Sequence, residues 1–498
     1  TLPNRLTEEV IMELETAVNL NIPIEAHLLR GCCREADRCE IVAMGLDQLR
    51  IALPESFHGH LIALTGEIRS SCRLLRDLAD RSQVHFSRVP IVANYLNVVL
   101  PCLSRTLKDI IGYYEEKTIS REMRWRKMYN KMTEEASGLP LPQRFVLYNH
   151  FLSLLKQLLT RSPSFELNTL ETLRTRILKL REQRGIAPPP MQIGTLVRQE
   201  LMPLAIMQDA NAHWAEQIFS LPLPSRTALK HLRPSKSYGP FYPWGHFTIP
   251  SESKILFRRP FDEDRISIVV YLNSVDQSPY LLMRTMQGDI PWFSLFGAHE
   301  LCINREGSAL QLKRWSRSEQ CSKLWAALYF LTWEEMVLFY CTFVALKARN
   351  MLTVQIHPNE FGLQREKRLF QAQIIDDGFK HSLIVYEDIQ TRGLRLHAAV
   401  WEGELRQCPV WTAFVTHQSQ SRTWLSRRSK HRVWLKDVQL YVFCSAYRQE
   451  NMRQNKSGAF EIYFDREEGA KRFREVFALR MANVESSEEV DNDDAGPS

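Results

Sequence analysis

The chain is 498 residues long, which corresponds to about three domains at roughly 100–200 residues each. Hydrophobic residues make up 44% of it and charged residues 24%, so the composition excludes a wholly disordered chain. The formal net charge is +7, but the segment from Glu485 onward holds six carboxylates and no Lys or Arg, so the remainder carries +13. An excess of this size fits an anionic partner, and it also fits a chain that needs charge only for solubility.

The ten cysteines make up about 2% of the chain, far below the density of a disulfide-stabilised scaffold. They lie in apolar or helical runs, which predicts reduced thiols in an intracellular compartment. One set of residues suggests a metal site at first sight: Cys32, Cys33, Cys39, His27, His58 and His60. Because this set lacks the paired C-x-x-C spacing of zinc sites, we predict that the protein holds no metal.

The longest interior apolar run, residues 336–346, spans about 11 residues and is too short to cross a bilayer. The sequence starts at Thr1 without a methionine, so a longer N-terminus with a targeting segment stays open. We expect a cytoplasmic protein, with a peripheral membrane location as the alternative.

Residues 1–183 are predicted to form an all-α helical bundle. Residues 145–159 place apolar side chains at nearly every helical core spacing, as a central helix of a bundle needs. The next predicted helix carries a 3-4-3 apolar stripe made of Leu170, Leu173, Ile177 and Leu180. No glycine-rich phosphate loop interrupts this region.

The triple proline at residues 188–190 is the first clear break, so residues 184–245 are predicted to be a Pro-rich linker with one helix. An aromatic cluster lies around its end: Tyr238, Phe241, Tyr242, Trp244 and Phe247. These side chains either dock the linker onto the next domain or present an anchor to a partner. Both interpretations stay open at this point.

From residue 254 onward the pattern changes to short alternating runs separated by turn residues. Seven strand candidates lie between residues 254 and 331, and a helix is predicted over residues 332–347. The same order returns with seven candidates between residues 369 and 464 and a helix over residues 465–480. This spacing predicts two small antiparallel barrels or sandwiches.

The two strand-to-helix junctions align without a gap at an offset of 134 residues. In both, an aromatic residue ends the last strand. An acidic residue, Glu334 or Glu468, lies in the first turn of the helix, where a negative charge interacts favourably with the helix dipole. The phenylalanines predicted to close each copy are Phe330, Phe339 and Phe343 in the first and Phe464, Phe473 and Phe477 in the second. Two coincidental junctions are the alternative to an internal repeat.

Seven strands followed by a helix with inward aromatics resembles the pleckstrin-homology-like superfold, and residues 460–477, FEIYFDREEGAKRFREVF, look much like the end of such a domain. The resemblance implies a multidomain α and α+β protein. Its all-α bundle would precede two pleckstrin-homology-like seven-stranded β-barrels, at residues 246–349 and 360–482, each closed by a C-terminal helix. The layout is also similar to that of uncharacterised proteins of filamentous fungi. Members of the superfold bind phosphoinositides, phosphotyrosine peptides, proline motifs or Ran, so the fold does not select the ligand.

Residues 422–436 are predicted to form a basic loop. They include two tryptophans, no acid and six cations: Arg422, Arg427, Arg428, Lys430, Arg432 and Lys436. Cationic side chains beside aromatic rings are suited to the phosphates of a lipid, a phosphopeptide or a nucleic acid. A solvated loop whose tryptophans pack inward is the other interpretation. Residues 483–498 are predicted to be a disordered acidic tail, which we hypothesise to shield this loop.

Phosphoinositide-binding members of the superfold usually carry their basic motif between the first two strands. The corresponding loops here contain acids, at residues 262–264 in the first copy and at Asp376 and Asp377 in the second. These carboxylates would repel a phosphate, so lipid recognition would need the later basic loop.

The sequence holds no nucleophile elbow, phosphate loop, H-E-x-x-H helix or kinase-type block, so we predict no catalytic residue, no cofactor and no enzymatic activity. The leading hypothesis is a non-enzymatic intracellular adaptor or scaffold that binds a protein or peptide partner along a sheet edge or beside a closing helix. The alternative is a peripheral membrane protein that binds anionic lipid through residues 422–436. Nucleic acid is a less favoured partner, and the oligomeric state stays open.

Overall fold

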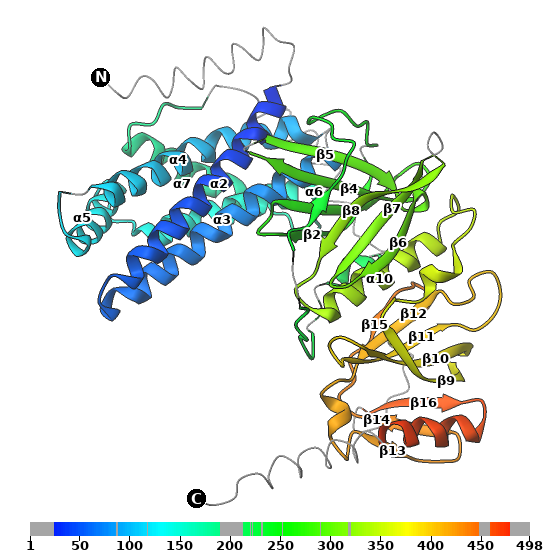
Figure 1. Cartoon of the computed structure of the whole chain (residues 1–498). Coiled ribbons are helices and arrows are strands. Elements are labelled where there is room, and N and C mark those ends of the chain that lie inside the picture. The colour runs from blue at the N-terminus through cyan, green and yellow to red at the C-terminus, as the bar shows by residue number, and fades with distance from the viewer. Residues whose placement is uncertain are drawn as a thin grey trace, which may run out of the picture. The chain divides into compact units, whose positions relative to one another are not determined.

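Figure 1 shows the computed structural model of the chain. It describes residues 24–478 with gaps at 86–87, 117, 190–212, 220, 222, 231–232, 251, 289, 317–319 and 448–458. The predictions made for residues 1–23, for most of the linker helix and for the acidic tail at 483–498 lie outside the described residues.

Internal contacts group the chain into two compact units. The first comprises Thr1–Asn211, Pro240–Val275 and Leu282–Leu295, and the second comprises Ala212–Gly239, Asp276–Leu281 and Phe296–Ser498. The β-rich half of the chain therefore contributes to both units. The domain boundaries expected from the sequence stay predictions.

Six long helices form the described N-terminal part of the first unit (Figure 1). They are α2 (Ile24–Ile51), α3 (His58–Val84), α4 (Val89–Glu115), α5 (Arg121–Glu134), α6 (Leu141–Thr160) and α7 (Leu167–Gln183). α6 packs against α3, α4, α5 and α7, and Phe145, Tyr148 and Phe151 on it are fully buried. This matches the central role that its apolar pattern predicts. The prediction of an all-α region is confirmed for these residues.

A four-stranded antiparallel sheet follows, most of which belongs to the first unit. Its strands are β2 (Lys254–Phe261), β3 (Ile266–Leu272), β4 (Pro279–Gln287) and β5 (Ile290–Gly297), in that order across the sheet. β3 is buried along almost its whole length, because α3 packs against it within the first unit. A strand covered on both faces is expected to be rich in β-branched residues, and its sequence ISIVVYL fits.

The second unit begins with a second four-stranded sheet and a long helix. The sheet has the order β1-β8-β7-β6, and its members are β1 (Lys236–Ser237), β6 (Leu301–Glu306), β7 (Ala309–Ser316) and β8 (Cys321–Tyr329). The helix is α10 (Trp333–Ala348), which starts at the N-cap Thr332. The short helix α9 (Trp214–Gln217) lies earlier in the same unit.

An eight-stranded sheet completes the second unit. It has the order β13-β14-β16-β9-β10-β11-β12-β15. Its strands are β9 (Glu366–Asp376), β10 (Phe379–Asp388), β11 (Leu394–Val400), β12 (Pro409–Phe414), β13 (Leu425–Arg427), β14 (Arg432–Leu435), β15 (Tyr441–Val442) and β16 (Phe460–Phe464). A helix over residues 467–478 follows β16.

The two predicted seven-stranded barrels need correction in detail. The first region does contain seven strands, β2 to β8, but they divide over two sheets, and the linker adds β1 to one of them. The second region has an eighth strand, β13, which the sequence analysis placed in a basic loop. Among the described strands neither region closes into a barrel, because the outermost strands, such as β13 and β15, pair on one side only.

The repeated junction is present at the predicted offset. α10 begins at Trp333 and the last described helix begins at residue 467, so the two starts are 134 residues apart. The rings of Phe330 and Phe339 lie 5.6 Å apart, and those of Phe464 and Phe473 lie 5.5 Å apart. All six phenylalanines named above are buried. Their role in closing a barrel stays a prediction.

The two helices of the repeat have different surroundings. α10 is buried on nearly every side, and it packs against β7 and also against β12 of the eight-stranded sheet. Trp333 contacts Phe414 at 5.4 Å, and a Cβ on Gly393 would lie 2.6 Å from the same indole, so this position needs glycine. Helix 467–478 instead buries one face, at Ala470, Phe473 and Phe477, and exposes its charged side chains.

Candidate binding surface

The end of the linker docks onto its own chain. Tyr242 exchanges two backbone hydrogen bonds of 2.8 Å with Phe293 on β5, and the Trp244 ring packs 5.5 Å from Phe293. Trp244 also packs against the helical core of the first unit. In the second unit Tyr238 stays 48% exposed, with the Lys236 ammonium over its ring. Of the two interpretations of the aromatic cluster, intramolecular docking therefore describes Tyr242 and Trp244.

Neighbouring segments of the chain occupy part of each edge of the three strands β8, β7 and β6. Lys236 and Ser237 pair with β8 as an added strand. On the opposite edge, the backbone N–H groups of Ile303 and Arg305 donate to the side chains of Glu360 and Gln364, at 3.3 and 2.6 Å. A peptide could not pair with these stretches of β8 and β6, because their backbone groups are already used.

Glu334 anchors the linker, which the sequence analysis missed. Its carboxylate is fully buried and accepts hydrogen bonds from Ser225 Oγ, Thr227 N and Thr227 Oγ1, each at 2.7 Å. The interpretation of Glu334 as a residue that only serves the first helical turn is therefore incomplete. Glu468, its counterpart in the repeat, is exposed.

The loop between β2 and β3 is tied down inside the first unit. Asp264 pairs with Arg258 at 2.7 Å, and Arg76 on α3 donates to the carbonyl of Glu263 at 2.5 Å. Burial alone lowers the pKa of Arg258, but the neighbouring carboxylates, Asp80 foremost, outweigh it and raise that pKa. The carboxylate of Asp264 thus pairs within the sheet, and the backbone of Glu263 ties the loop to α3.

The loop between β9 and β10 also directs a carboxylate inward. Asp376 accepts a hydrogen bond of 2.9 Å from Trp411 Nε1, and burial raises the pKa of its carboxyl group. Phe379 at the start of β10 is 61% exposed. Neither loop between the first two strands offers a cluster of cations among the described residues.

The predicted basic loop is a strand pair. β13 and β14 pair antiparallel, with Leu425 opposite Leu435, and β14 pairs with β16. Trp424 points inward, 3% exposed, with its ring 4.9 Å from that of Phe477. The inward packing that the sequence analysis proposed for both tryptophans holds for Trp424 alone. Trp434 is partly exposed and donates a hydrogen bond of 2.8 Å to Glu461.

Five cations of this strand pair have exposed side chains, and we call them the cationic face. They are Arg422, Arg428, Lys430, Arg432 and Lys436. The remaining cation of the run, Arg427, lies on β13 opposite Val433.

The guanidinium of Arg428 stacks over the Trp434 ring at 4.1 Å, which holds one cation of the face in place. Two glutamates lie against the same face. Lys430 lies 3.6 Å from Glu467, and Arg432 lies 3.8 Å from Glu461. The face therefore presents five exposed cations with two glutamates and a partly exposed indole beside them.

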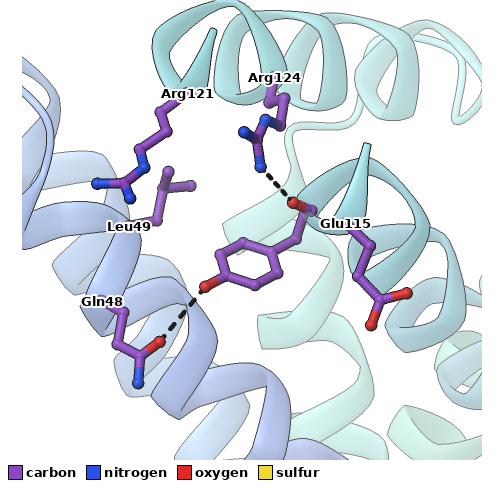
Figure 2. Close-up of a pocket in the computed structure, with 6 residues that line it drawn as sticks. Gln48, Leu49, Glu115, Arg121 and Arg124 are labelled. Carbon is purple, nitrogen blue, oxygen red and sulfur yellow. Dashed lines mark hydrogen bonds between the residues drawn. The ribbon is translucent and has the colours of Figure 1, made fainter. Parts of the chain in front are cut away.

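Figure 2 shows a cavity in the helical region that the sequence analysis did not anticipate. It measures about 380 Å³ and lies where α2, α4 and α5 meet. Its lining comprises Gln48, Leu49, Tyr114, Glu115, Arg121 and Arg124. Arg124 already donates to the carbonyls of Tyr114 and Ile119, at 2.8 and 3.0 Å, so its guanidinium serves the fold. The lining brings no nucleophile and base together.

Two buried thiols of the helical region, Cys33 and Cys102, are unsuited to nucleophilic chemistry. Burial raises the pKa of Cys33 to about 12 and the pKa of Cys102 to about 11, so both stay protonated near neutral pH. No group of three or more His, Cys, Asp or Glu side chains in the described part of the chain is placed to hold a metal ion. Among the described helices, none has the length and apolarity needed to span a membrane.

Comparison with protein-family models matches two consecutive stretches of the chain. Residues 245–365 and residues 367–482 each match a model described as a PH domain found in tandem in fungal proteins. The two stretches contain β2 to α10 and β9 to helix 467–478, which are the two copies of the repeat. Searches of the curated proteins and of the solved structures found no match.

Proposed function

We propose that this chain, which contains two tandem PH domains of the kind found in fungal proteins behind a helical N-terminal region, is a non-enzymatic adaptor. The family matches confirm the resemblance to the pleckstrin-homology-like superfold. PH domains are typically non-catalytic binding modules. In our proposal the second PH domain binds a protein or peptide partner through the cationic face.

The contrast between α10 and helix 467–478 carries this proposal. In the first domain the closing helix is buried, the sheet beside it has part of each edge occupied by the chain itself, and the loop between its first strands is held by α3. In the second domain the helix exposes one side, and the neighbouring strand pair exposes five cations. The first domain then serves as a structural hub, and recognition falls to the second.

The chemistry of the cationic face favours a partner with clustered negative charge. Arg428 is held over Trp434, so less side-chain entropy is lost when its guanidinium meets a carboxylate or phosphate. Trp434 and Tyr463 lie on the same side of the sheet as Arg432, since Arg432 pairs with Tyr463 across the strands and Trp434 with Glu461. An acidic or phosphorylated peptide with an apolar side chain would use both features.

Affinity isolation with the full chain tests the proposal. The variant Arg428→Gln/Lys430→Gln/Lys436→Gln should lose the proteins that the unmodified chain retains. The matched control Lys131→Gln/Arg176→Gln/Lys179→Gln removes three exposed cations from α5 and α7 and should retain them. Equal recovery with the first variant and the unmodified chain would refute a role for the cationic face.

An anionic membrane surface is the second candidate, because the same cations lie beside a partly exposed tryptophan. Sedimentation with vesicles of phosphatidylcholine containing about one fifth phosphatidylserine distinguishes the two. An adaptor stays in the supernatant, whereas a peripheral membrane protein pellets and is released by the three substitutions in the cationic face. Binding to DNA or RNA with a steep salt dependence would instead favour the third class.

A further inference from the structure

The last described helix ends beside the start of the strand pair that bears the cationic face. Phe477, one residue before the end of the described chain, packs 4.9 Å from Trp424, which lies directly before β13. The chain therefore leaves the described structure beside the strand β13, which Arg422 and Arg428 flank in the sequence. The acidic residues from Glu485 onward follow only seven positions after Ala478.

The two ends of the cationic face lie near the two ends of helix 467–478. At its end near Phe477, the backbone N–H of Lys436 donates to the carbonyl of Trp424 at 2.8 Å. At its other end, Lys430 lies 3.6 Å from Glu467 in the first turn. Twelve helical residues span about 17 Å, so the cationic face extends about that far along the helix.

The acidic segment can reach the whole of this face. Seven extended residues cover up to about 23 Å, and the stretch from Glu485 to Asp494 covers up to about 30 Å. Six carboxylates lie in that stretch, and no cation interrupts them. The undescribed chain thus leaves from the Lys436 end of the face, and the acidic stretch is long enough to extend from there to Lys430.

We infer that the acidic segment 485–498 docks in cis on the cationic face and masks it. Exposed ion pairs are individually weak, but a tether of this length gives an effective concentration in the millimolar range. The docked state is therefore sensitive to salt and is displaced by a partner that offers denser negative charge. Docking of the segment does not depend on which partner the face binds, so its test needs no partner.

The test measures binding of a fluorescein-labelled synthetic peptide of residues 485–498 by fluorescence anisotropy. The chain truncated after Val484 should bind this peptide saturably at low salt. The full chain should bind it at least tenfold more weakly, because its own segment competes. Raising the salt concentration from about 50 to 300 mM should weaken binding to the truncated chain.

Two variants of the truncated chain provide the controls. Arg428→Gln/Lys430→Gln/Lys436→Gln should bind the peptide at least tenfold more weakly, and Lys131→Gln/Arg176→Gln/Lys179→Gln should bind it as the parent does. Circular dichroism establishes that both are folded. A peptide with its six carboxylates replaced by amides should not bind, and this keeps the test decisive even where a protein variant is unstable.

Three results would overturn cis docking. One is equal affinity of the peptide for the full and truncated chains, and another is unchanged affinity after substitution of the cationic face. The third is a molar mass of the full chain that rises with concentration in light scattering, while that of the truncated chain does not. That result would assign the segment to the face of a second molecule.

Discussion

The ring of Phe339 on α10 packs 5.6 Å from that of Phe330 at the end of β8, with 53° between the ring planes. The equivalent pair in the second domain, Phe464 and Phe473, repeats this contact at 5.5 Å and 49°. The same local packing thus serves a buried helix in one copy and a half-exposed helix in the other. The junction is therefore alike in the two copies, while the outer surfaces of the two helices differ.

Glu334 and Glu468 occupy the same position of the repeat, so they form a matched pair for mutation. Glu334→Ala should destabilise the second unit by about 2–4 kcal/mol, because Ser225 and Thr227 would keep buried donors without an acceptor. Glu468→Ala should cost less than about 1 kcal/mol, since it removes only a favourable charge at a helix N-terminus. Urea unfolding followed by tryptophan fluorescence measures both, and equal costs would contradict the anchoring role of Glu334.

Asp80 on α3 joins the helices of the first unit to the sheet. Its buried carboxylate accepts from Arg258 at 2.7 Å and from Ser267 at 2.6 Å, and it also pairs with Arg284. Asp80→Asn should destabilise the first unit by about 3–5 kcal/mol, because it removes the carboxylate that two buried guanidinium groups, those of Arg258 and Arg284, share.

The exposed pair between Asp47 and Arg69 provides the control for this prediction. Asp47→Asn should cost less than about 1 kcal/mol. Hydrogen exchange in α3 and β3 reports both effects locally. If Asp80→Asn accelerates exchange in these two elements no more than Asp47→Asn does, the buried network contributes little to stability.

Stability should fall as the pH drops below about 6.5. His397 is completely buried beside Arg395, and burial followed by this positive charge holds its pKa well below the usual value. The unfolded chain therefore takes up a proton near pH 6.5 while the folded chain does not, so acid favours unfolding. Each such histidine lowers the free energy of unfolding by about 1.4 kcal/mol for every pH unit below pH 6.5.

His397→Gln tests this assignment. Glutamine keeps an acceptor for Arg395 but does not titrate. The slope of the unfolding free energy against pH, measured between pH 6 and pH 5, should therefore decrease by the contribution of about one proton. His85 in the first unit, whose pKa is also held well below the usual value by burial and by nearby arginines, should keep its own contribution. An unchanged slope in the variant would show that His397 does not govern the acid sensitivity of the second unit.

The elements that could be predicted from the sequence are those with local signals. The apolar stripe of α7 and the junction around Phe464 depend on neighbours three or four residues apart or on strand alternation, which the sequence displays directly. The role of Asp80 could not be predicted, because Arg258 and Ser267 lie more than 170 residues away along the chain. No local pattern distinguishes such an aspartate from one on a solvated face.

The cationic face shows the same limit. Its cations and tryptophans were visible in the sequence, but their arrangement on β13 and β14 was not, since β13 has only three residues. The glutamates that lie against it, Glu461 and Glu467, come from β16 and the following helix. Tertiary pairing therefore decides how much of the charge remains available to a partner.

Amide hydrogen exchange of the full chain tests most directly whether the two PH domains have divided their tasks. The account predicts that α10 exchanges among the slowest segments, through unfolding of the whole second unit, and that helix 467–478 exchanges at least tenfold faster. Exchange of α10 as fast as that of helix 467–478 would contradict it, because the first domain would then present its closing helix to solvent as the second does.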